Sequence, residues 1–121
     1  MTELTPGGHT CHPNTHAFPH IDGKHVATHF ATTCSKPDGL SYLWRLEIAL
    51  FAPGGSDNQR DMTLVGNPVT FDQATTEVKL LCETGKWESQ VRLRYRLDAW
   101  LSKWKPIYHN SHYIQINCPS P

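Results

Sequence analysis

Histidine, a common metal ligand and general base, is concentrated in the first quarter of the chain. His12, His16 and His20 recur every four residues, a spacing that would place them on one face of a helix. Pro13 and Pro19 argue against a continuous helix, and on a strand residues four apart lie about 13 Å from each other. A folded-back segment would still bring three histidines together, so a small metal-dependent hydrolase remains an alternative hypothesis.

The sequence lacks the common catalytic motifs. It contains no Gly-x-Ser-x-Gly elbow, no glycine-rich phosphate loop and no His-Glu-x-x-His pair. A catalytic pocket would also compete for space with the core of a chain this short. We therefore favour a non-enzymatic binding or structural module without a cofactor.

Three arginines alternate along one predicted strand, so Arg92, Arg94 and Arg96 point outward together. Arginine forks match planar oxyanions, and this stripe could hold phosphate, sulfate or an acidic glycan. The alternative is a ladder of surface ion pairs in which Glu77 lies opposite Arg92. Three further carboxylates are available to the other arginines in such a ladder: Glu47, Asp72 and Asp98.

Aromatic residues gather near the last connection of the chain. Trp100, Trp104 and Tyr108 could form a patch that stacks on sugars or contacts a protein. Lys103 and Lys105 lie between them and indicate partial exposure. A carbohydrate-binding module using Trp100 and Trp104 is a second alternative. The predicted binding residues are thus Arg92, Arg94, Arg96, Trp100, Trp104 and Tyr108.

The four cysteines, Cys11, Cys34, Cys82 and Cys118, suggest two disulfides and an oxidising compartment. Cys34 and Cys82 fall on inward faces of predicted strands, so we expect them to pair, with Cys11 bound to Cys118. Closing the loop from Cys34 to Cys82 would contribute roughly 4 kcal/mol on the chain-entropy model. Without a Cys-x-x-Cys spacing, the cysteines are poor zinc ligands.

Alternating apolar and polar residues predict an all-β fold. Residues 1–24 show neither the two-residue alternation of a strand nor the 3.6-residue repeat of a helix. They are predicted to form an irregular His/Pro/Gly-rich arm, followed by one domain over 25–121. The strongest alternation begins at Tyr42, and the clearest hairpin joins residues 77–82 to 87–100 through Gly85. About seven strands without a convincing helix favour an antiparallel, immunoglobulin-like β-sandwich.

Charge and composition narrow the partners. Eleven basic residues balance eleven acidic ones in 121 residues, so nucleic acid is not favoured. No apolar run approaches the roughly 20 residues needed to cross a bilayer, and membrane insertion is not expected. The N-terminus lacks the pattern of a signal peptide. We expect an extracellular or virion location, and release of a phage virion by lysis would reconcile this start with disulfides.

One short motif carries a resemblance. The run from Cys82 to Trp87, with Gly85 between them, precedes an alternating strand and a late Cys118. It resembles the Cys-x-x-Gly-x-Trp hairpin of small secreted immunoglobulin-like proteins of actinobacteria and of virion proteins of their phages. The resemblance implies a disulfide-braced sandwich with an adhesive or structural role. The histidine-rich arm and the absent signal pattern depart from the secreted members, so we expect a virion decoration or tail protein, or a cell-surface adhesion domain. The expected partners are a protein or neighbouring subunits, with a glycan as a further candidate.

Overall fold

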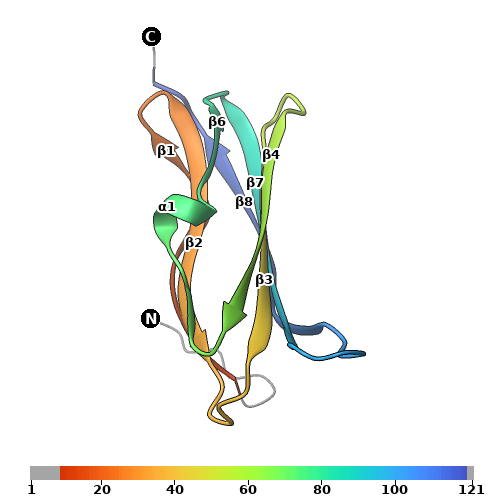
Figure 1. Cartoon of the computed structure of the whole chain (residues 1–121). Coiled ribbons are helices and arrows are strands. Elements are labelled where there is room, and N and C mark those ends of the chain that lie inside the picture. Colours follow the sequence, from red (N-terminus) through yellow and green to blue (C-terminus); the bar gives the residue numbers. More distant parts are fainter. Residues whose placement is uncertain (1–8, 120–121) are drawn as a thin grey trace.

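Two antiparallel sheets face each other as a β-sandwich (Figure 1), which confirms the predicted fold class. The structure is a computed structural model and describes residues 9–119, apart from the side chains of residues 13–16. The first sheet contains β1 (Thr10–Asp22), β2 (His25–Ser35), β5 (Val69–Phe71) and β6 (Val78–Leu81). The second has the order β4 (Asp57–Gly66), β3 (Tyr42–Phe51), β7 (Gly85–Leu97) and β8 (Lys105–Ile116). A single turn of helix, α1 (Gln73–Thr76), joins β5 to β6.

The predicted irregular arm is wrong for residues 10–22, which form β1 and pair with β2 along most of its length. Proline is tolerated here because β1 is an edge strand, where a missing N–H can face away from the ladder. The register shifts between His16 and His20, so the pairing is interrupted. The described residues therefore form eight strands, one more than expected.

The predicted hairpin between residues 77–82 and 87–100 is also wrong. β6 pairs with β2, whereas β7 lies between β3 and β8, so the connection through Gly85 crosses from one sheet to the other. Gly85 does have a positive φ of 149°, and a Cβ atom there would lie 2.8 Å from the side chain of Pro53. The glycine thus permits a close approach between two connections and a crossing of sheets.

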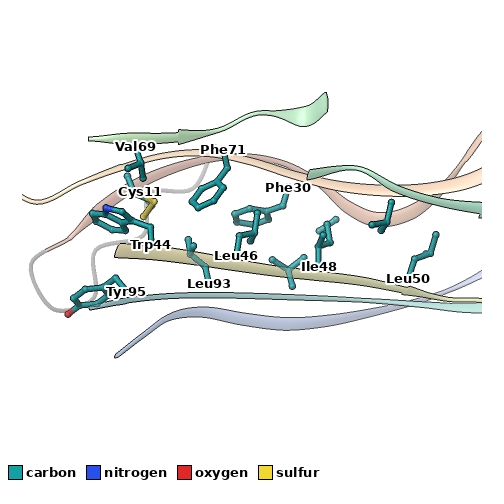
Figure 2. Packing of buried hydrophobic residues seen from close by; sticks show 14 of the residues in the cluster. Cys11, Phe30, Trp44, Leu46, Ile48, Leu50, Val69, Phe71, Leu93 and Tyr95 are labelled. Atoms are coloured by element: carbon teal, nitrogen blue, oxygen red, sulfur yellow. A yellow bond between two sulfur atoms is a disulfide. The ribbon is translucent and has the colours of Figure 1, made fainter. Parts of the chain in front are cut away.

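Alternation along β3 and β7 builds one half of the core, as predicted. The inward residues of β3 are fully buried or nearly so: Tyr42, Trp44, Leu46, Ile48 and Leu50. Val91, Leu93 and Tyr95 of β7 lie beside them. Figure 2 shows this layer packed against Phe30 and Phe71 of the first sheet. The apolar faces of the two sheets pack against each other, so the outer face of the second sheet carries the alternating polar residues.

Several polar side chains of the interior donate hydrogen bonds to backbone carbonyls. Trp44 donates its indole N–H to the carbonyl of Gly66 at 2.8 Å, and Trp87 donates to Glu83 at 2.7 Å. The carbonyl of Ala17 lies where the register of β1 shifts, and it accepts hydrogen bonds from the hydroxyls of Thr28 and Ser89. Because Ser89 belongs to the second sheet, this carbonyl joins the two layers.

Both disulfides exist, but the predicted pairing is wrong. Cys11 is bonded to Cys34, its direct cross-strand neighbour in β1 and β2. Cys82 is bonded to Cys118, which ties the end of β6 to the segment after β8 and so links the two sheets. An inward-facing cysteine does not specify its partner, because the partner depends on which strands become neighbours. Two disulfides indicate an oxidising, extracellular environment.

Candidate functional site

The outer face of the second sheet carries the predicted arginine stripe. Arg92, Arg94 and Arg96 all point away from the core, as the alternation predicted. In the register, Arg94 lies opposite Arg45 of β3 and Arg92 lies opposite Glu47. Basic groups from two neighbouring strands are therefore close together on this face.

Part of this face is an ion-pair ladder. Glu47 binds Arg94 and also lies 4.0 Å from Arg45, as expected for a carboxylate shared between arginines. Arg45 binds Asp61 at 2.5 Å, and this hydrogen bond holds the pKa of Asp61 below its ordinary value. Glu47 is thus confirmed as a partner of the stripe.

Two other predicted ladder residues have different roles. Glu77 does not face Arg92, because β6 belongs to the other sheet, and it binds Lys79 at 3.2 Å. Asp72 caps α1 and accepts a hydrogen bond from the backbone N–H of Thr75 at 2.9 Å. The side chain of Arg92 is exposed and makes no hydrogen bond or ion pair with the side chains that the structure describes.

Trp104 lies over the end of the stripe. Its ring centre is 5.7 Å from the guanidinium of Arg94 and 5.2 Å from that of Arg96. A cation over an aromatic face is attracted by the ring quadrupole, so Trp104 holds both arginines against the sheet. The side chain of Arg94 is only 14% exposed and is engaged by Glu47, whereas Arg96 has the ring as its partner.

The connection from β7 to β8 presents two large apolar side chains to solvent. Trp100 is 89% exposed and Leu101 is 84% exposed. The loop is held by its own hydrogen bonds: the N–H of Leu97 donates to the hydroxyl of Ser102 at 3.0 Å, and that of Ala99 donates to the carbonyl of Leu97 at 2.9 Å. Figure 1 shows this loop projecting beyond the sandwich.

A second loop lies beside the base of this projection. The backbone N–H of Asp98 donates to the carbonyl of Ser41 at 3.1 Å, which connects the β7–β8 loop to the β2–β3 loop. Leu40 in the β2–β3 loop is 51% exposed. One end of the sandwich therefore displays Leu40, Trp100 and Leu101. Sequence reasoning missed both leucines, although apolar residues within loops rich in charge and proline were a usable signal.

A polar groove of about 440 Å³ lies further along the same face. Its floor is at Ala49, whose small side chain lies between the longer Gln59 and Gln90 of the neighbouring strands. Arg92 and His109 contribute to its wall. Sequence reasoning missed the groove because only the register shows that Ala49 lies between two glutamines.

Tyr108 lies apart from the exposed aromatic residues. Its ring is 5.3 Å from that of Phe30 and packs against the core. His109 and His112 point to opposite faces, as predicted: His109 lines the groove, and His112 lies 4.0 Å from the ring of Phe18. Partial burial lowers the pKa of His112.

The predicted metal residues lie along β1. His12 is exposed, and the Nδ1–H of His20 donates a hydrogen bond to the carbonyl of Phe18 at 3.0 Å. The side chain of His16 lies outside the described residues. Among the side chains that the structure describes, no three His, Cys, Asp or Glu residues are grouped closely enough to hold a metal ion.

No protein-family model and no curated protein matches its sequence. Within the described residues, no helix has the length and apolar character needed to cross a membrane. Function must therefore be argued from the surface itself.

Proposed function

We propose that the chain is a non-enzymatic binding module that acts outside the reducing cytosol, as a virion component or a cell-surface adhesion domain. Its contact surface is the basic hairpin, which we define as Arg92, Arg94, Arg96, Trp100, Leu101, Lys103, Trp104 and Lys105. The 89% exposure of Trp100 is the observation that carries this proposal. A tryptophan left in water on a rigid support is typical of a contact residue.

Charge supports the same surface. Five of the eleven basic residues lie between positions 92 and 105, where Asp98 is the one acidic residue. The chain is neutral as a whole, so this segregation creates a local positive field. A partner with an acidic surface is therefore favoured. The two disulfides and the resemblance of the Cys82–Trp87 run support work in an oxidising setting.

Binding to heparin, a sulfated polysaccharide, tests the surface. Arg92→Ala/Arg96→Ala removes two charges from the basic hairpin, whereas Lys24→Ala/Lys86→Ala removes two charges at the other end of the sandwich. At roughly 0.5–1 kcal/mol for each contact, the first pair should weaken binding about 5- to 30-fold. Titration calorimetry at fixed salt measures the difference.

The second variant has the same net charge and should bind nearly as the unmodified protein does. An equal loss in both variants would mean that heparin senses only net charge, and it would overturn the proposed surface.

A further inference from the structure

The most exposed apolar side chains of the described chain form a convex tip. Trp100 and Leu101 exceed every other large hydrophobic residue in exposure, and Leu40 on the adjacent loop adds to the same end. Neither tip side chain is packed against the core of the described residues. An apolar tip that projects from a rigid sandwich needs a partner that can deform around it or enclose it.

The backbone at the tip reinforces this point. Leu101 has a φ of 65°, a left-handed conformation that glycine or asparagine adopts at lower cost. The hydrogen bond between Leu97 and Ser102 spans this residue and fixes the turn. A large aliphatic side chain at such a position is costly for folding, which directs attention to its function.

Basic residues flank the tip on both sides in the sequence. Lys103 and Lys105 follow it within five residues of Trp100, and Arg96 lies on the strand that precedes it. Lysines and arginines near an apolar anchor extend their charged ends to phosphates while their stems cover apolar surface. Tryptophan is enriched at the same depth, the boundary between lipid headgroups and acyl chains. This arrangement of tip and charge fits an interfacial membrane anchor.

We infer that the acidic partner is an anionic lipid surface, on which Trp100 and Leu101 enter the interface while Arg96, Lys103 and Lys105 contact lipid phosphates. The inference rests on the proposed function and names the partner of the same basic hairpin. It describes docking on a bilayer and requires no spanning segment.

A second copy of the chain fits less well. The groove of about 440 Å³ on the outer sheet face is lined mainly by polar residues, Arg92 among them, and an inserted Trp100 would bury this guanidinium, which has no ion-pair partner among the described residues. A lipid interface accommodates a convex tip without a preformed cavity. The charge pattern also matches a continuous anionic plane.

Co-sedimentation with vesicles tests the inference. We expect the protein to bind phosphatidylcholine vesicles that contain phosphatidylglycerol and to bind pure phosphatidylcholine weakly. Trp100→Ser/Leu101→Ser should lower the partition coefficient at least about tenfold, because it removes the apolar anchor. The matched control is Leu81→Ser, which changes a side chain that is 69% exposed on β6, away from the tip. That control should bind normally.

Charge is tested with a second matched pair. Lys103→Glu/Lys105→Glu should abolish binding to the anionic vesicles, whereas Lys24→Glu/Lys86→Glu, with the same net charge, should retain most of it. Quenching by brominated lipid should reach the unmodified protein and fall sharply in Trp100→Ser, since Trp44 and Trp87 are buried in the core and Trp104 is partly covered by Arg94 and Arg96.

Several results would overturn the inference. Vesicle binding that survives Trp100→Ser/Leu101→Ser would remove the tip as the anchor. Heparin binding without vesicle binding would leave the proposed function intact and refute the lipid partner. Concentration-dependent self-association that Trp100→Ser abolishes, without vesicle binding, would assign the tip to a second copy. If the unmodified protein bound neither heparin nor anionic vesicles, both proposals would be refuted.

Discussion

The four tryptophans divide between two regions of the molecule. Trp44 and Trp87 are fully buried in the body of the sandwich, and each donates its indole N–H to a backbone carbonyl. Trp100 is almost fully exposed, and Trp104 stacks on arginines of the basic hairpin. The same residue type thus stabilises the body and is free for contact at the hairpin. Stability and binding should be separable by mutation.

Trp87→Ala should have the largest effect on the body. Loss of a buried indole removes packing and leaves a cavity, at a cost of about 3–5 kcal/mol in the free energy of unfolding. Trp100→Ala should change that free energy by less than about 0.5 kcal/mol, because its side chain contacts mainly solvent. Urea denaturation measures both. A comparable loss in Trp100→Ala would erase the distinction between body and hairpin.

Removal of the disulfides should come next in size. Cys82→Ala/Cys118→Ala opens a bridge between residues separated by 36 positions, and Cys11→Ala/Cys34→Ala one separated by 23. The chain-entropy model gives losses of about 4 and about 3 kcal/mol, respectively. Guanidinium denaturation of each double variant checks these values. A melting temperature that reductant leaves unchanged would contradict a stabilising role for either bridge.

Glu47→Gln should have a smaller effect, because this carboxylate is about one-third exposed. The change weakens its contacts with Arg94 and Arg45 and should reduce stability by roughly 1 kcal/mol or less. It should also strengthen heparin binding, because removal of the carboxylate charge makes the surface around Arg94 and Arg45 more positive. Glu88→Gln makes the same charge change further along β7 and is the control. Equal heparin affinities in the two variants would argue against a local effect.

His112 should give the smallest effect, visible as a pH dependence. Its pKa is lowered by burial, so the folded state binds its proton less readily than the unfolded state. This favours the folded state fully above the ordinary histidine pKa of about 6.5, and the contribution is lost as pH falls toward the lowered value. His112→Asn should flatten this slope in chemical denaturation, whereas His109→Asn on the opposite face should preserve it. Matching slopes would refute the assignment.

Local patterns predicted the elements better than their partners. The alternation through Trp44, Leu46 and Ile48 places β3 on the core, and the outward direction of the arginines follows from the same period. β1 was missed because its prolines and histidines interrupt the apolar alternation that identifies a strand. An edge strand tolerates prolines, since it pairs with one neighbour only. The pairing of β6 with β2 was missed because the alternation of side chains along β6 would be the same beside any other strand.

The candidate site was predictable in part. Trp100, Trp104 and the arginines were identified from residue type and spacing, and the structure adds their order: Trp104 covers two arginines while Trp100 remains free. Tyr108 was placed in the patch because it is near in sequence, but along β8 its direction is set by the pleat, and it faces Phe30. The disulfide partners depend on contacts between strands far apart in sequence, which no local pattern contains.

The bridge from Cys82 to Cys118 encloses the whole of β7, the exposed loop and β8 in one covalent ring. Lys103 is exposed within this ring and is a natural target for a trypsin-like protease. A cut after Lys103 would leave both fragments joined, by the disulfide and by the β7–β8 ladder. The nicked protein would migrate as one chain until reduced, so a protease could cut the exposed loop without separating the two halves of the second sheet.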